Sequence, residues 1–188
     1  MKKALVIIAI VGVVVWGGTT LLLNLAKSKS PRQGAEFVDG DLKINVSYSG
    51  PFKKGREIFG EQGLVPFGEV WRTGANEATY IRTTKALYAK GQMLKPGKYS
   101  IWTIPGPDTW QVIFNSEYPW WPSWGINMNG SVNRNPAKDA VIVEVPVATQ
   151  DNVVEQFAIS LEKVDEDIEL TFWWDRTLVA VPLSLSAQ

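Results

Sequence analysis

The sequence contains no cysteine and no histidine among its 188 residues. These two absences exclude disulfides, cysteine nucleophiles, catalytic triads that use histidine, and zinc or haem sites with thiolate or imidazole ligands. Any metal would need oxygen ligands, as calcium and magnesium prefer. Neither sign of charge is in excess, because 19 Lys and Arg residues balance 19 Asp and Glu residues. There is no basic stripe, phosphate-binding loop or dinucleotide fingerprint, so we expect no nucleic-acid partner, no cofactor and no metal.

A long run without charge lies near the N-terminus. Residues 4–26 contain no charged side chain, and a helix of that length spans about 34 Å, whereas a bilayer core needs about 30 Å. A cleaved signal peptide is the alternative, because Lys2 and Lys3 precede the run, but no good cleavage site follows it. We therefore predict that residues 1–26 form an uncleaved transmembrane anchor, with residues 4–26 in the lipid bilayer.

The charges on the two sides of this run nearly balance. Lys2 and Lys3 precede it, and Lys27, Lys29 and Arg32 follow it, so the positive-inside rule decides little. The rest of the chain is slightly acidic, which gives it no attraction to an anionic cytoplasmic leaflet. A short tail before a first span is typical of a signal anchor. We predict a single-pass protein whose globular part lies outside the cytoplasmic membrane.

Trp16 lies near the middle of the predicted span, although tryptophan normally prefers the membrane interfaces. Two small residues, Gly17 and Gly18, follow it, and small residues allow another helix to approach closely. Two interpretations stay open. The ring either faces lipid, or packs against a partner helix or a pigment.

Residues 27–40 are polar and are interrupted by Pro31 and Gly34, so we interpret them as a linker. From residue 41 to residue 188, apolar and polar side chains alternate in short runs separated by turn residues, as in half-buried strands. The predicted strands cover residues 42–48, 78–84, 99–104, 110–115, 140–147, 155–164, 167–174 and 177–185. No long amphipathic helix follows the anchor. We predict an all-β fold, an antiparallel β-sandwich of jelly-roll-like type over residues 41–188, preceded by one transmembrane helix.

A glycine-rich segment without periodicity, residues 56–79, carries several charged and amide side chains. One interpretation is structural: Arg72 pairs with Glu77 or Glu69 and fixes the loop, because an Arg–carboxylate pair is strongly directional. A second interpretation is a pocket for an anionic or sugar-like ligand. A third, hydrolysis by two carboxylates, would use glutamates of this segment. The candidate binding residues are Arg56, Arg72, Asn76 and Glu77, and we assign no catalytic residue.

Tryptophan is concentrated in a proline-broken loop that contains Trp120, Trp121 and Trp124. Rigid aromatic side chains in a loop serve as anchors at a protein or membrane interface, as platforms for sugar rings, or as core residues. We interpret these three and Trp16 as interface residues. Trp173 and Trp174 are neighbours in a predicted strand, so we expect one ring in the core and the other on the opposite face.

Four blocks of this sequence resemble the bacterial domain-of-unknown-function family 2911. They are R-E-I-F-G at residues 56–60, L-V-P-F-G-E-V-W at 64–71, W-R-T-G-A-N-E-A-T at 71–79 and P-G-K-Y-S-I-W-T-I-P at 96–105. The resemblance covers about residues 38–182 and implies an exported or membrane-anchored bacterial protein. No activity is attached to the family.

These observations favour a non-enzymatic function. We expect a single-span accessory subunit of a bacterial membrane protein complex, in the cytoplasmic (inner) membrane with its globular domain on the periplasmic side. Its expected partners are the other subunits of that complex and the lipid bilayer. A membrane-tethered module that binds a small ligand or a carbohydrate is the alternative, and a carboxylate-dependent hydrolase is a third possibility.

Overall fold

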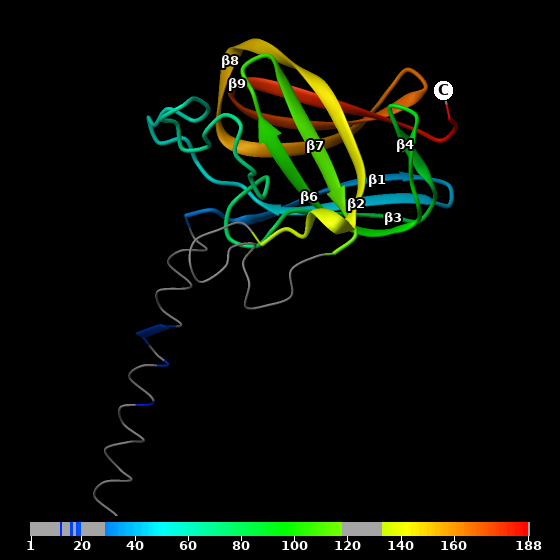
Figure 1. Cartoon of the computed structure of the whole chain (residues 1–188), viewed down its shortest axis with the longest axis horizontal. Helices are drawn as coiled ribbons and strands as arrows, with labels where there is room; N and C mark the ends of the chain where they lie inside the picture. The colour runs from blue at the N-terminus through cyan, green and yellow to red at the C-terminus, as the bar shows by residue number, and fades with distance from the viewer. Residues whose placement is uncertain (1–11, 13–15, 17, 20–28, 118–132, 188) are drawn as a thin grey trace, which may run out of the picture.

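The computed structural model describes residues 29–117 and 133–187, together with residues 12, 16, 18 and 19. Apart from one short 3-10 helix, the ordered elements of residues 29–187 are strands (Figure 1). The strands are β1 (Arg32–Asp39), β2 (Leu42–Ser49), β3 (Tyr80–Thr83), β4 (Leu87–Ala89), β5 (Gln92–Leu94), β6 (Gly97–Pro105), β7 (Thr109–Asn115), β8 (Asp139–Val164) and β9 (Asp167–Ser184), and the 3-10 helix is η1 (Pro136–Lys138). The all-β class predicted from the alternating pattern is confirmed.

The strands form an antiparallel, sandwich-like arrangement in the order β1-β2-β3-β6-β7-β8-β9-β4-β5. The long strand β8 connects its two parts. Its first portion, up to Pro146, pairs with β7, and the portion from Val147 onward pairs with β9. Register shifts between Thr149 and Ala158 bend β8, which allows it to curve over the top of the domain in Figure 1. The four short strands predicted over residues 140–147, 155–164, 167–174 and 177–185 are therefore two long strands, β8 and β9.

The strand order differs from the jelly-roll part of the prediction. A jelly roll combines two Greek keys, in which many paired strands are distant in sequence. Within the described residues, only the β3–β6 and β9–β4 neighbours are not consecutive strands. The fold is mainly a meander to which the β4–β5 hairpin is added. Alternating hydrophobicity specifies half-buried strands but not the order in which they pair, so the pattern could not supply this distinction.

The predicted linker over residues 27–40 is wrong for its second half. Arg32–Asp39 form β1 and pair along their whole length with β2, from Arg32 opposite Ser49 to Asp39 opposite Leu42. The half-buried side chains of Ala35 and Phe37 pack against the core. The sequence did not predict this strand, because the side chains on its outer face are polar and Pro31 directly precedes it.

A cluster of aromatic rings occupies the core beneath one end of the domain. Phe59 contacts Trp71 and Trp110 edge-on, and Phe157 contacts both Trp71 and Trp174, with centroid distances of 5.1 and 5.8 Å. Edge-to-face rings at such distances add to the energy of burial. These rings come from separate strands and from the segment between β2 and β3, and they support that segment from below.

Within the part of the chain that the structure describes, no helix is long and apolar enough to span a membrane. Most of the predicted anchor, residues 4–26, lies outside the described residues. Trp16 is described, and its side chain is 71 % exposed. Trp120, Trp121 and Trp124 also lie outside the described residues.

Candidate functional site

The segment that joins β2 to β3 contains residues 56–79 and lies at one end of the sandwich, on the left of Figure 1. Backbone hydrogen bonds fix its second half. Trp71 exchanges two bonds with Thr103 of β6, at 2.7 and 2.9 Å, and the Ala75 N–H donates to the Ser49 carbonyl at 2.9 Å. The loop is therefore held between the end of β2 and the middle of β6. Irregular segments of this length are commonly functional.

The backbone of this loop adopts conformations that most residues avoid. Thr73 and Asn76 both have φ of 57°, and Gly74 has φ of 151°. A positive φ at a β-branched threonine is rare and costs energy, and such strain clusters at functional sites. Buried hydrogen bonds hold the strained backbone: the Thr79 hydroxyl donates to the Thr73 carbonyl at 2.6 Å, and the Thr73 hydroxyl donates to that of Thr103 at 3.2 Å.

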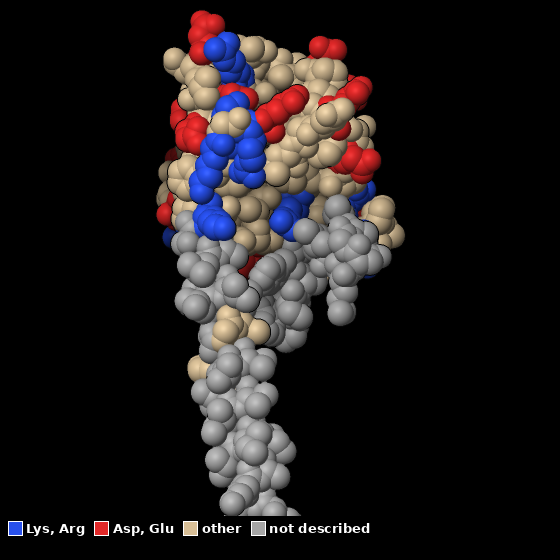
Figure 2. Space-filling view, turned by 90° about the vertical axis from the view of Figure 1, so that its left-hand side faces the viewer, with Lys and Arg blue, Asp and Glu red and all other residues tan. Residues whose placement is uncertain are grey.

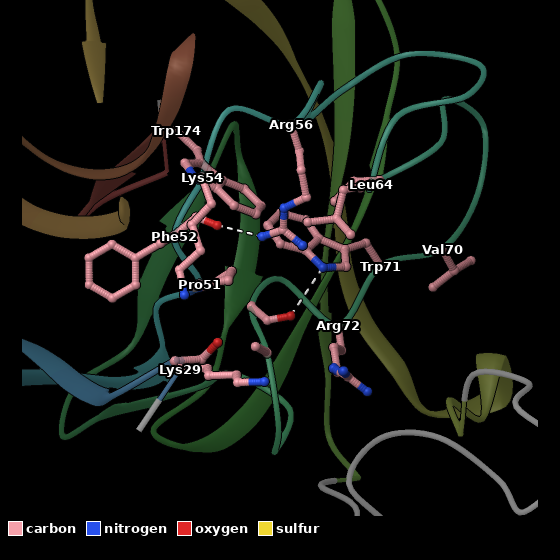
Figure 3. Close-up of a pocket in the computed structure, with 14 residues that line it drawn as sticks. Lys29, Pro51, Phe52, Lys54, Arg56, Leu64, Val70, Trp71, Arg72 and Trp174 are labelled. Atoms are coloured by element: carbon pink, nitrogen blue, oxygen red, sulfur yellow. Dashed lines mark hydrogen bonds between the residues drawn. The ribbon is translucent and has the colours of Figure 1, made fainter. Parts of the chain in front are cut away.

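A pocket of about 660 Å³ opens beside this loop (Figure 3). Its size is within the range of about 300–1,000 Å³ that is common for small-molecule sites. Four cationic side chains line it, whereas no Asp or Glu of the described residues does. The cations are Lys29, Lys54, Arg56 and Arg72. The apolar lining is contributed by Phe52, Leu64, Val65, Val70, Trp71 and Trp174.

Two stacked tryptophans form the aromatic part of the pocket. The rings of Trp71 and Trp174 lie 6.0 Å apart between centroids, with 19° between their planes. Each indole N–H has a backbone acceptor, since Trp71 donates to the Gly74 carbonyl at 3.1 Å and Trp174 to the Glu155 carbonyl at 3.4 Å. These bonds fix the rings before any ligand binds. Trp174 is buried and Trp173 half-buried, as expected for neighbours on a strand.

Arg56 lies in the middle of the pocket beside Trp71, and Lys29, Lys54 and Arg72 lie around it (Figure 3). The guanidinium of Arg56 donates to the carbonyls of Lys53 and Phe52, which fixes its position. The same segment is tied to the β8–β9 pair, because the Lys53 ammonium binds the carboxylate of Asp175. The Arg56 guanidinium is therefore positioned in advance for a ligand.

Arg72 is partly buried, and its electrostatic environment reflects this. Burial lowers the pKa of Arg72 below its ordinary value, and the nearby carboxylate of Glu77 acts in the opposite direction. A guanidinium remains charged after any modest shift, because its pKa starts above about 12. Partial desolvation makes its attraction for an anion stronger than it would be in water.

The structure brings only two of the four predicted binding residues into the pocket. Arg56 and Arg72 line it, whereas Asn76 and Glu77 do not. The Asn76 amide instead donates to the Ser30 carbonyl at 3.1 Å, which ties the loop to the chain just before β1. Glu77 acts electrostatically on Arg72, which agrees with the structural interpretation of this loop.

Several pocket residues outside the predicted segment 56–79 were not predicted as site residues, among them Lys29, Lys54 and Trp174. Lys29 was missed because it lies in the predicted linker. Lys54 was missed because it and Lys53 are only two adjacent charges, and Trp174 because it lies in a predicted strand. No spacing in the sequence joins them. The pairing of β1 with β2 brings together the segments that carry Lys29 and Lys54, and the contacts of Phe52 and Lys53 with β8 and β9 bring Trp174 to the same place. The one local signal was the Lys53–Lys54 pair, which is too short to indicate a site by itself.

The site has no metal-binding character in the described part of the chain, where no group of three or more Asp or Glu side chains could hold a metal ion. Figure 2 shows the side of the molecule that faces left in Figure 1. Lys and Arg side chains gather over the lower half of the described surface, and most Asp and Glu side chains lie above them or at the margins.

The model of the family described as "Protein of unknown function (DUF2911)" matches residues 30–183 of the chain. This range includes β1 to β9 apart from the last residue of β9, and it includes every described residue that lines the pocket except Lys29. Comparison with curated proteins and with solved structures gave no match.

Proposed function

The chain belongs to the DUF2911 family, and because that family is described only by its unknown function, we propose a function from the geometry of the pocket. The protein is a membrane-tethered, non-enzymatic module that binds a small anionic ligand with an apolar part. The observation that carries this proposal is the pocket, in which four cations surround the rings of Trp71 and Trp174. The tether is the helix over residues 4–26, and the domain lies on the periplasmic side of the bacterial inner membrane.

The charge of the pocket supports an anionic ligand. A cavity lined by one sign of charge raises the local concentration of the opposite sign, and no described carboxylate lines this one. Arg56 and Arg72 also supply forked N–H donors, which match the oxygens of carboxylates, sulfonates and phosphates. A neutral sugar would use the tryptophan rings but would carry no negative charge to interact with the four cations that line the pocket.

The remaining lining supports a ligand with an apolar part. Leu64, Val65 and Val70 lie beside the two stacked tryptophans, so a ligand that fills the pocket covers apolar surface as well as charge. Rings that are fixed by their own hydrogen bonds lose little entropy when a ligand covers them. The pocket is therefore suited to an amphiphile more than to a small inorganic anion.

The absence of carboxylates from the described lining also bears on the hydrolase alternative. Hydrolysis by two carboxylates needs both groups beside the scissile bond, about 5–10 Å apart. Glu57, Glu69 and Glu77 do not line the pocket. The site therefore favours binding over this reaction.

One observation favours a second function, that of an accessory subunit of a membrane complex. Trp16 belongs to the predicted span and lies near its middle, whereas tryptophan normally prefers the membrane interfaces, and the small residues Gly17 and Gly18 beside it would let a partner helix approach closely. The two functions are compatible, since a subunit of a complex can also hold a small ligand.

Calorimetric titration of the full chain in an uncharged detergent tests the binding function. The probes are 2-naphthalenesulfonate, an anionic arene, and 2-naphthalenemethanol, its uncharged counterpart. We expect the sulfonate to bind and the alcohol to bind at least about tenfold more weakly, because a charge-assisted hydrogen bond contributes about 1.5–3 kcal/mol. The variants Arg72→Gln and Lys54→Gln should each weaken sulfonate binding.

Lys163→Gln is the matched control, because Lys163 is an exposed cation near the end of the β8–β9 hairpin. It should leave sulfonate binding unchanged. Equal affinity for the sulfonate and the alcohol would refute an anion site, and so would an equal effect of the Lys54 and Lys163 substitutions. Because Lys54 is exposed, its variant retains the fold even if Arg72→Gln loses stability.

A further inference from the structure

The pocket lies close to the place where the chain leaves the predicted membrane anchor. Lys29 and Ser30 line it, and the anchor ends at residue 26. Three residues span at most about 11 Å when fully extended. The cationic lining is therefore within reach of the headgroup region of the bilayer that holds the anchor.

We propose that this pocket binds the phosphate-bearing headgroup of an anionic lipid from the same membrane. The inference rests on the proposed function and specifies its ligand. The guanidinium and ammonium groups of Arg56, Arg72 and Lys54 bind the phosphate oxygens, and Lys29 approaches from the membrane side. The tryptophans and Leu64 contact the glycerol and the first carbons of the acyl chains.

The chemistry of the lining matches such a headgroup. A phosphodiester carries one negative charge on two free oxygens, and Arg and Lys are its usual protein partners. Leu64 lines the pocket and is 46 % exposed. Contact with a lipid would remove its apolar surface from water, which is favourable, whereas an inorganic ion offers no apolar surface to cover it. Arg56 and Leu64 lie on the same side of the pocket in Figure 3.

A second group of cations lies just beyond the pocket on the outer face of the sheet. Arg32, two residues after Ser30, donates from its guanidinium to the Tyr80 hydroxyl at 2.8 Å and to the Ser47 hydroxyl at 3.0 Å. The Lys98 ammonium lies 3.9 Å from the centroid of the Tyr80 ring. Basic side chains beside a membrane anchor are attracted to anionic lipid, by about 1 kcal/mol each near the surface. This group extends the positive surface around the same end of the domain.

The same phosphate chemistry could come from a water-soluble phosphate. Three features favour the lipid: the short distance from the anchor, the exposed Leu64 and the stacked tryptophans. A free ion has no apolar part to contact Leu64 or the tryptophans, and it has no need of a site near the membrane. The experiment therefore compares a lipid with the phosphate groups that it contains.

Native mass spectrometry of the full chain, released from uncharged detergent, measures lipid adducts directly. The detergent contains equal trace amounts of phosphatidylglycerol and phosphatidylcholine. We expect phosphatidylglycerol adducts to exceed phosphatidylcholine adducts by about tenfold. The choline group of phosphatidylcholine cancels the charge of its phosphate, which corresponds to the loss of about one charged contact. The double variant Lys29→Gln/Lys54→Gln, in which both side chains are exposed, should reduce these adducts by about tenfold or more. Lys163→Gln should not.

Competition with glycerol 3-phosphate and with inorganic phosphate separates the two sources. We expect neither to displace the lipid at equal concentration. Displacement by either would overturn the lipid inference and leave an anion site of the proposed kind. Binding of 2-naphthalenesulfonate without any preference for phosphatidylglycerol would overturn the lipid inference alone. The absence of binding by both the sulfonate and the lipid would overturn the proposed function as well.

Discussion

Gly74 is the residue on which the geometry of the pocket loop depends most directly. Its φ of 151° lies in a region that side chains rarely adopt, and a Cβ added there would lie 3.0 Å from the Ser49 carbonyl oxygen and 3.1 Å from the Thr79 hydroxyl. The close approach of these groups lets the Ala75 N–H reach β2 and lets the Trp71 indole bond to the Gly74 carbonyl. One glycine thus supports both the strained turn and the position of a pocket ring.

Gly74→Ala should therefore destabilise the protein by about 2–5 kcal/mol, since an unfavourable φ costs about 1–2 kcal/mol and a forced contact about 1–3 kcal/mol. Thermal unfolding of the full chain measures the change. Gly55→Ala is the control, because Gly55 also has a positive φ of 70° but its added Cβ would meet nothing within 4 Å. We expect a cost of about 1 kcal/mol there. Equal losses in the two variants would contradict the role of the contact with Ser49.

At the scale of elements, alternation of apolar and polar residues predicted β2, β3, β6 and β7 closely. It predicted β8 and β9 as four short strands, because the bends at register shifts look like turns in sequence. It missed the short strands β4 and β5, which offer too few residues for a period to be visible, and it missed β1. Phe37 of β1 is only half-buried, and the polar residues around it give the sequence no clear sign of a strand.

A buried polar cluster is another feature that the pattern could not predict. The carboxylate of Asp139, at the start of β8, binds the guanidinium of Arg134 at 2.9 Å and accepts from the Asn115 amide at 2.7 Å. The side chains of Arg134 and Asp139 are only 13 % and 8 % exposed. The cluster joins the end of β7 to the start of β8, so it fixes both sides of the intervening chain.

Asp139→Ala should cost about 3–5 kcal/mol of folding stability, because it leaves a buried guanidinium without its partner. Thermal or urea unfolding measures the loss. The matched control is Asp41→Ala, which removes an ion pair with Lys85 in which the Asp41 side chain is 96 % exposed and the two charges are 3.9 Å apart. Exposed pairs contribute about 0–1 kcal/mol. Similar losses in both variants would show that the cluster is not energetically distinct from a surface pair.

For the whole molecule, the sequence predicted the all-β class of fold, which is confirmed. It also singled out Arg56 and Arg72, which line the pocket. The net charge of zero gave no sign of the pocket, because it sums over the whole chain, whereas four cations and no described carboxylate line the pocket. Lys29, Lys54 and Trp174 join the arginines through contacts between parts of the chain that are far apart in sequence, such as the bridge between Phe52 and Gln156 of β8. This part of the pocket lining therefore depends on the topology, and no local pattern contains it.

The Trp loop of Trp120, Trp121 and Trp124 distinguishes an accessory subunit from an independent binding module. Pro119 and Pro122 lie beside these residues in the sequence, and the prediction is that their restricted backbone lets a partner cover the three rings at little cost in entropy. Central aromatic anchors often contribute about 2–4 kcal/mol to an interface. The triple variant in which all three residues become alanine should unfold at nearly the normal temperature but lose the chains that co-purify with the full protein in mild detergent.

Trp102→Ala provides the comparison for this last experiment. The Trp102 side chain is fully buried and its indole N–H donates to the Ser100 hydroxyl at 2.8 Å, so its removal should cost about 3–5 kcal/mol of stability. A similar loss of stability in the triple variant would place the loop in the core. Retention of every co-purifying chain would reject the subunit role. If the binding function and the subunit function use separate residues, sulfonate binding should survive the triple substitution. Loss of partners with retained binding would show that one chain carries both functions at separate sites.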